Sequence, residues 1–410
     1  MITFGTLFFQ KQRMNYLADR INRLGESQTI QMAKLSRELK AKGEDIIDLS
    51  LGEPDFPTPQ HICDAADQAM KDGFTHYTPV AGFPDLRLAI SNKFKRENNL
   101  DYAPEQIVVS TGAKNSIINV VLSLLNPGEE AIIPTPYWVS YSEMVNLAQG
   151  KVVFIKSTVE TYFKISAAQL EAAITDNSKL LIFSSPCNPT GSFYTKDELE
   201  AFANVIAKHP KLHVISDEIY EHINFTGKHE SIAQFEQIKN QVITVNGVSK
   251  CYAMTGWRIG YIGAPLNIAK ACEKMQSQFT SGTNSIAQKA ATAALNGPLD
   301  TVNVMLDKFH QRRDLVYDYL KKIPGLKVNL PPGAFYFFPD VSFYFGKSFG
   351  NHTIKNADDL CMYLIHEAKV SVVTGSAFGD DNCIRISYST SSAQLHEAMK
   401  RLTVALSQLH

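Results

Sequence analysis

The chain has 410 residues, which is too many for one compact core and predicts two or three domain-sized units. Apolar residues make up 44% and charged residues 20%, and the formal net charge of −1 argues against non-specific nucleic-acid binding. No apolar run approaches the roughly 20 residues that span a bilayer, and none of the cysteines forms a CxxC pair. We therefore expect a cytoplasmic protein with reduced thiols and with no membrane or nucleic-acid partner.

The first residues differ in composition from the rest of the chain. Residues 1–13 are largely apolar, but they lack the positive start and the small-residue cleavage site of a signal peptide. From Met14 onward the sequence becomes charged and helical in pattern. We expect residues 1–26 to form an N-terminal arm, of which residues 1–13 contribute little to stability.

The middle of the chain alternates between strand and helix patterns. The predicted strands are 107–110, 179–185, 212–216, 241–245 and 257–264, and the predicted helices between them include 113–125 and 196–208. Such alternation predicts an α/β domain around a mostly parallel sheet. Active sites in these sheets lie at the carboxyl ends of the strands.

After about residue 300 the pattern changes. A long amphipathic helix is predicted over 302–322, followed by a strand at 334–338, a helix at 357–368 and a strand at 383–388. This order predicts a smaller α+β unit. The only close histidine pair, His209 and His213, is separated by the helix breaker Pro210, so we expect no metal site.

Three polar motifs follow predicted strands in the middle of the chain. They are Asn188-Pro189-Thr190-Gly191, then Asp217-Glu218-Ile219-Tyr220, and then Lys250 with Arg258 eight residues later. Each has an ordinary interpretation when taken alone: a turn, a helix cap with a core tyrosine, and a surface charge. Their occurrence together, in this order and at strand ends, indicates an active site instead.

With these motifs the sequence resembles the fold-type I enzymes that use pyridoxal 5′-phosphate, and within them the class I aminotransferases. The resemblance runs from about Ser27 to the C-terminus and is strongest to the bacterial aspartate aminotransferase subgroup. The shared segments are 52–56 (GEPDF), 77–79 (YTP), 136–140 (PYWVS), 254–260 (MTGWRIG) and 333–336 (GAFY). It implies a large cofactor-binding domain over residues 61–305, and a smaller α+β domain built from residues 27–60 and 306–410.

The resemblance also implies how the cofactor is held. Lys250 would bind it as a Schiff base and move the α-proton of the substrate. Asp217 would pair with the pyridine nitrogen and keep it protonated, which lets the ring accept electrons. Tyr220 and Asn188 would hydrogen-bond the ring oxygen, and Trp138 would stack on the ring.

For the cofactor phosphate, the resemblance points to a helix start after a strand and to one arginine. These donors are Gly112, Ala113, Lys114 and Arg258. Many relatives place a phosphate-binding hydroxyl where this chain has Gly247, and Ser249 is the candidate to replace it. Tyr77 matches a residue that reaches the phosphate from the partner subunit, which implies a homodimer.

Substrate recognition is implied at both ends of an amino acid. Arg385 would grip the α-carboxylate with its planar fork, near Gly52, Asn188 and Trp138. A surface arginine is the alternative, disfavoured because the neighbours Ile384 and Ile386 are apolar. Lys114 would select dicarboxylic substrates, as in the subgroup that also carries an early Ser-x-Thr, here Ser27 and Thr29. Its alternative role is a second cation for the phosphate.

The expected reaction is amino transfer from L-aspartate to 2-oxoglutarate, giving oxaloacetate and L-glutamate. Aminotransferases for prephenate, aromatic or alanine-type substrates are the nearest alternatives, and a β-lyase using the same cofactor is a weaker one. A remote alternative is a cofactor-binding regulatory module. Such regulators carry a DNA-binding segment before the domain, for which the resemblance beginning near Ser27 leaves no room.

Overall fold

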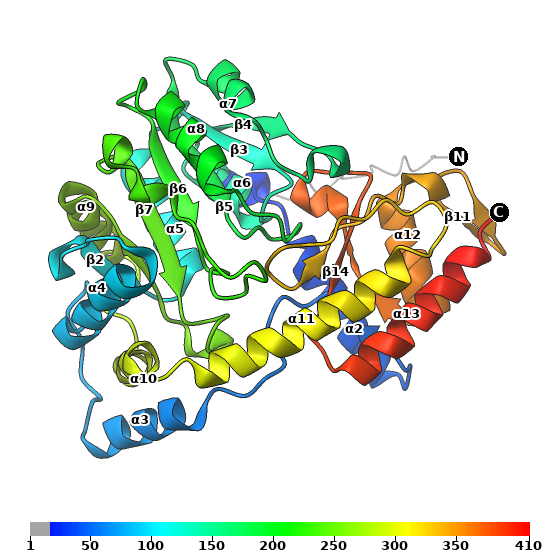
Figure 1. Ribbon diagram of the computed structural model, residues 1–410, viewed down its shortest axis with the longest axis horizontal. Helices are drawn as coiled ribbons and strands as arrows, with labels where there is room; N and C mark the ends of the chain where they lie inside the picture. The colour runs from blue at the N-terminus through cyan, green and yellow to red at the C-terminus, as the bar shows by residue number, and fades with distance from the viewer. Residues whose placement is uncertain (1–16) are drawn as a thin grey trace, which may run out of the picture.

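A computed structural model describes residues 17–410 of the chain (Figure 1). The expectation for residues 1–13 therefore lies outside the described residues. The helices are α1 (Asp19–Arg23), α2 (Gln28–Ala41), α3 (Gln60–Lys71), α4 (Pro84–Asn98), α5 (Ala113–Leu124), α6 (Ser140–Leu147), α7 (Ala167–Ala173), α8 (Lys196–Ile206), α9 (Leu266–Ser277), α10 (Ser285–Asn296), α11 (Asp300–Leu320), α12 (Ala357–Tyr363) and α13 (Ser392–Ser407).

The largest element is a seven-stranded sheet in the order β2-β8-β7-β6-β5-β3-β4. Its strands are β2 (Ile107–Ser110), β3 (Glu130–Thr135), β4 (Lys151–Lys156), β5 (Ser178–Ser184), β6 (His213–Asp217), β7 (Val242–Gly247) and β8 (Gly260–Gly263). Only β8 runs antiparallel to its neighbours, β2 and β7. The sheet is therefore mostly parallel, which confirms the predicted fold class of the large unit.

Helices bury both faces of this sheet. One apolar cluster joins the sheet to α5, α6 and α9, and another joins it to α7 and α8. A third cluster packs α3, α4 and α10 around β2 and the segment that carries Lys250. Because both faces are covered, the strands read as almost continuous apolar runs and the polar residues gather at their ends.

A smaller unit lies beside the large sheet, and the long helix α11 runs along it toward α12 and α13 (Figure 1). It contains the antiparallel sheet β13-β14-β9, the hairpin β10-β11 and the parallel pair β1-β12. Their bounds are β1 (Ile47–Asp48), β9 (Tyr336–Phe337), β10 (Ser348–Phe349), β11 (His352–Thr353), β12 (Val370–Ser371), β13 (Val373–Thr374) and β14 (Ile384–Ser387).

The N-terminal segment joins this smaller unit through the pairing of β1 with β12 and through α2, which packs on β12 and β13. This pairing supports the proposed assembly of the small domain from residues 27–60 and 306–410. The proposed boundary at 305/306 falls inside α11, which continues from Asp300 to Leu320.

The prediction and the structure differ at two predicted elements and at two further strands. The strand predicted over 257–264 begins only at Gly260, because a 3₁₀ turn occupies Thr255–Trp257 and Arg258 adopts left-handed backbone. The helix predicted over 357–368 changes at Leu364 into a π-helical turn. The two strands β3 and β4 were not predicted at all.

Candidate active site

A cavity of about 280 Å³ opens at the carboxyl ends of β5, β6 and β7, between the large sheet and the smaller unit. All of the predicted site residues except Gly112 and Tyr77 line it: Gly52, Ala113, Lys114, Trp138, Asn188, Asp217, Tyr220, Ser249, Lys250, Arg258 and Arg385. The strand order places them together although they come from segments more than 300 residues apart.

Lys250 follows β7 and points into this cavity. Its Nζ donates a hydrogen bond to the carbonyl oxygen of Gly52 at 2.6 Å and lies 5.8 Å from the ring centre of Tyr220. Burial, together with the charges of Arg258 and Arg385, lowers the pKa of Lys250 to about 8, although Glu53 acts in the opposite direction. A neutral amine, which is the nucleophilic form, is therefore accessible near neutral pH.

Asp217 ends β6 and is buried on the cavity wall. Its Oδ2 accepts a hydrogen bond from the Tyr141 hydroxyl at 2.7 Å, and its Oδ1 accepts one from the Ile219 amide at 3.3 Å. Burial raises the pKa of Asp217 to about 6 against these two hydrogen bonds. None of the described residues places a cation in direct contact with this carboxylate, and a protonated ring nitrogen would supply one.

The start of α5 forms the corner that suits an anion. Its unpaired N–H groups follow Gly112, whose positive φ of 84° and lack of a side chain let the Arg258 guanidinium approach closely. Arg258 is itself held by a hydrogen bond from Nη1 to the Thr255 carbonyl at 2.8 Å. A side chain at Gly247 would meet the Ile259 carbonyl oxygen at 2.9 Å, so this position lacks room for the hydroxyl that many relatives carry there.

Arg385 lies on β14 with only 2% of its surface exposed, so the interpretation as a surface arginine is wrong. Nη1 donates to Asn188 Oδ1 at 3.0 Å and Nη2 donates to the Ser50 carbonyl at 2.5 Å. Within residues 17–410, its Nε has no hydrogen-bond partner. The flanking residues Ile384 and Ile386 are buried as well, so both faces of this strand are covered.

The segment before and within α2 closes one side of the cavity. Ser27, Thr29 and Ile30 line it, and the Gly25 amide donates a hydrogen bond to Glu143 Oε2 on α6 at 2.9 Å. The Thr29 hydroxyl has no hydrogen-bond partner in the part of the chain that the structure describes. Polar groups of the N-terminal segment therefore face the same space as Lys114.

Tyr77 lies outside the cavity, with 99% of its surface exposed. The resemblance assigns Tyr77 to the site of the partner subunit, so its contact with the phosphate remains a proposal. Sequence reasoning missed Tyr141, Tyr336 and Ser184, which also line the cavity. The Tyr336 hydroxyl lies 2.8 Å from that of Tyr220, and a side chain at Gly52 would meet it at 2.5 Å.

Comparisons with known proteins agree with this geometry. The family described as "Aminotransferase class I and II" matches residues 44–402. The chain belongs to this family of aminotransferases. The aminotransferase is 47% identical over 395 residues to a bifunctional aspartate aminotransferase and glutamate/aspartate-prephenate aminotransferase from Petunia hybrida, covering 95% of this chain and 82% of the relative.

Solved structures resemble the aminotransferase over nearly its full length. The aspartate aminotransferase from Rhizobium meliloti matches with a TM-score of 0.93 and 43% identity, covering 97% of this chain and 100% of that one. The aspartate aminotransferase from Thermus thermophilus with maleate matches with a TM-score of 0.90 and 37% identity, covering 96% and 100%. Within residues 17–410, no helix of the aminotransferase is both long enough and apolar enough to cross a membrane.

The family implies pyridoxal phosphate as the cofactor, and the residues of this aminotransferase fit it. The cavity holds a lysine with a lowered pKa and a buried aspartate without a direct cationic partner. Among the residues that the structure describes, one buried polar atom of a lining side chain, Arg385 Nε, has no hydrogen-bond partner. The glycine at the start of α5 leaves an open cradle beside Arg258.

Proposed function

We propose that the aminotransferase transfers the amino group of L-aspartate to 2-oxoglutarate, with pyridoxal phosphate bound to Lys250. The observation that carries the proposal is the convergence of Lys250, Asp217, Arg258, Arg385 and Lys114 on one cavity. Its cations would bind a phosphate and two carboxylates, although the net charge of the chain is only −1. Anions are therefore captured by individual side chains and not by a basic surface.

When bound, pyridoxal phosphate supplies an electron sink for the negative charge that develops at the substrate Cα. Asp217 would keep the ring nitrogen protonated, and the Tyr141 hydroxyl would hold this carboxylate in place. Tyr220 and Asn188 would hold the ring oxygen, and Trp138 would cover the ring. Lys250, once its amine is free and neutral, would remove the proton from the substrate Cα and deliver it to the cofactor.

Arg385 would bind the α-carboxylate. Its guanidinium is already oriented by Asn188 and the Ser50 carbonyl, and the unpaired Nε adds a free donor. A pre-oriented, desolvated fork loses little entropy on binding a carboxylate. The glycine at position 52 keeps the Tyr336 hydroxyl close to this region.

Lys114 and the start of α2 would bind the distal carboxylate. The Lys114 Nζ lies 4.9 Å from the ring centre of Trp138, and Thr29 lines the same cavity. The related enzyme from Thermus thermophilus was solved with maleate, a four-carbon dicarboxylate of the same size as aspartate. This supports a dicarboxylic substrate for the present chain.

A second candidate substrate is prephenate, which also carries two carboxylates. The relative from Petunia hybrida is named for both activities, and the same Lys114 and Arg385 would serve either substrate. We further propose that the enzyme is a cytoplasmic homodimer in which Tyr77 reaches the partner's phosphate site. The full exposure of this phenol ring supports an interface at that surface.

The decisive experiment mixes the purified protein, loaded with pyridoxal phosphate, with single amino acids and follows the cofactor's visible absorbance. We expect aspartate and glutamate to bleach it, and alanine and phenylalanine to react far more slowly. Reduction with borohydride followed by peptide mapping should label Lys250. Labelling of a different lysine, or a preference for alanine over aspartate, would contradict the proposal.

A further inference from the structure

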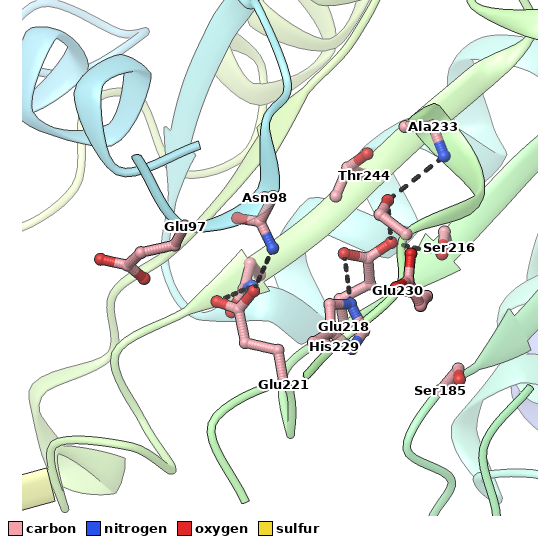
Figure 2. Close-up of polar contacts among 12 residues, drawn as sticks. Glu97, Asn98, Ser185, Ser216, Glu218, Glu221, His229, Glu230, Ala233 and Thr244 are labelled. Carbon is pink, nitrogen blue, oxygen red and sulfur yellow. Dashed lines mark hydrogen bonds and ion pairs between the residues drawn. The ribbon is translucent and has the colours of Figure 1, made fainter. Parts of the chain in front are cut away.

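The turn that follows β6 presents side chains to two different environments. Asp217 and Tyr220 face the cavity, whereas Glu218 and Glu221 do not line it and are buried away from it. Figure 2 shows the Glu221 carboxylate facing the Asn98 amide, with Glu218 and His229 paired beside them. Two buried carboxylates thus alternate along the chain with two residues of the proposed active site.

Glu221 joins three separate segments. Its Oε2 accepts a hydrogen bond from Asn98 Nδ2 at the end of α4 at 2.7 Å, and its Oε1 accepts one from Asn246 Nδ2 on β7 at 2.7 Å. The Lys93 ammonium of α4 makes a short ion pair with Oε1 and also donates to Asn98 Oδ1 at 2.7 Å. Lys93 has only 1% of its surface exposed, so this pair is shielded from water.

Two of these segments, the turn after β6 and the strand β7, lead to the main proposed catalytic groups. Glu221 directly follows Tyr220 and stands four residues after Asp217, and Asn246 stands four residues before Lys250. Asn246 also accepts a hydrogen bond from the Gly247 amide at 2.7 Å, which orders the chain leading to Lys250. One buried carboxylate therefore links the turn of Asp217 and Tyr220 to the strand that delivers Lys250.

We propose that Glu221 is a positioning residue that fixes Asp217 and Tyr220 relative to Lys250, with Lys93 as its permanent counter-ion. This inference rests on the proposed function, because it assigns Glu221 a role through those three residues. A buried ion pair is weak evidence for stability as such, and replacement by apolar groups is often neutral. Its retention here is explained by the placement that its directional bonds provide.

The charges around Glu221 favour a built-in counter-ion over a bound metal. Burial opposes the charged carboxylate, but Lys93, His222 and His229 outweigh it and hold the pKa of Glu221 well below its ordinary value. Glu97 and His222 lie close enough to Glu221 that their ligand atoms fall within 4.8 Å of one another. The Lys93 ammonium already pairs with Glu221 and lies 3.6 Å from Glu97, so it supplies the cation there.

The test compares Glu221→Gln and Lys93→Met with Glu130→Gln in the protein loaded with pyridoxal phosphate. Glu130 is a matched control: it is buried at the start of β3, at the opposite end of the sheet, and is bonded to Lys151 and Thr175. The measurements are the melting temperature, the dissociation constant of pyridoxal phosphate, and the pH midpoint of the cofactor's visible absorbance. Asn246→Ala keeps Glu221 and its ion pair but removes the bond from β7 to Glu221 and the bond from the Gly247 amide, and it serves if the Glu221 variant fails to fold.

We expect all of these variants to melt at a lower temperature than the wild type. Only those at Glu221, Lys93 and Asn246 should weaken cofactor binding, by about tenfold, as when outer partners of metal ligands are removed. They should also move the pH midpoint by about half a unit or more. An unchanged midpoint and an unchanged dissociation constant in the Glu221 and Asn246 variants would overturn the inference, as would one equivalent of tightly bound metal that Glu221→Gln abolishes. A wild-type protein that gave no visible band would instead refute the proposed function.

Discussion

The side chains of the cavity carry an excess of positive charge. Lys250, Arg258, Arg385 and Lys114 all line it, and Asp217 is the one carboxylate among the described lining residues. Burial lowers the pKa of Lys114, and the nearby Arg258 lowers it further. Each cation therefore benefits from a bound anion, and the three anionic groups of a phosphate cofactor and a dicarboxylic substrate would supply them.

Lys114 provides the sharpest test of substrate choice. Replacing it by alanine should lower kcat/KM for aspartate by roughly 10- to 200-fold, because a hydrogen bond to a charged group contributes about 1.5–3 kcal/mol. Alanine, which lacks the distal carboxylate, should be affected far less. Steady-state kinetics with both amino donors, in Lys114→Ala and wild type, measure the ratio directly.

The exposed Lys274, on α9, provides a matched control for removal of a lysine, and Lys274→Ala should leave both substrates unchanged. Equal losses on aspartate and alanine in Lys114→Ala would show that this lysine serves the cofactor phosphate. The choice of aspartate would then lose its main support from the residues of this chain.

The sequence identified residues whose motifs lie at strand ends. It did not identify residues that contact them from segments far away in the sequence. Tyr141 is separated from Asp217 by 76 residues. In the sequence alone, nothing distinguishes this tyrosine from an ordinary core side chain. Tyr336 lay in a quoted motif, yet its contact with Tyr220 spans 116 residues. Glu221 gave no signal either, because a carboxylate in a polar turn is usually exposed.

At the scale of elements, predictions succeeded where a pattern was uniform. The strand β2 was predicted with its observed ends, and β5, β6 and β7 within one or two residues at each end. The strand β3 contains Glu130 and Pro134, residues that local preference excludes from strands. Its neighbour β4 lies at the sheet edge and is flanked by lysines. Only the pairing of β3 with β5, and of β4 with β3, defines them as part of the sheet.

The N-terminal elements allow a prediction about truncation. A chain beginning at Met14 should melt within a few degrees of the full chain, since we expect residues 1–13 to contribute about 1 kcal/mol or less. The helix α1, which follows them, has no buried residue, whereas α2 buries Ala33 and Ser36. Calorimetry and analytical ultracentrifugation of the two chains provide the measurement.

A chain beginning after Ile30 is the comparison for that experiment. It lacks Ser27, Thr29 and Ile30 from the cavity wall and the hydrogen bond between Gly25 and Glu143. We expect this longer truncation to lower kcat/KM for aspartate, unlike the shorter one. Loss of stability or of the oligomer on removal of residues 1–13 alone would show that these residues are docked.

For the whole molecule, the buried charged groups of the site lower the free energy of unfolding of the cofactor-free protein. Lys250 is desolvated among other cations, and Asp217 is a buried carboxylate whose pKa is raised to about 6. Both shifts mean that the charged form is less stable in the folded protein than in the unfolded chain. Cofactor binding would remove both penalties. The Lys250 amine would become a Schiff base, and the Asp217 carboxylate would gain the protonated ring nitrogen as its partner.

The penalty at Lys250 predicts that Lys250→Met stabilises the cofactor-free protein at neutral pH. The pKa of Lys250 falls from 10.5 to about 8, so the unfolded chain binds more protons there than the folded protein between these values. The free energy of unfolding therefore rises with pH across this window, and the penalty is fully present below pH 8. Removing the amine should raise stability at pH 7 by roughly 3 kcal/mol, or about 4 °C in Tm, and the gain should vanish near pH 10.5.

Thermal unfolding of cofactor-free Lys250→Met, Lys274→Met and wild type at pH 7 and 10.5 measures the effect. A gain of the same size at both pH values would mean that it comes from added apolar contacts and not from the charge of the buried lysine.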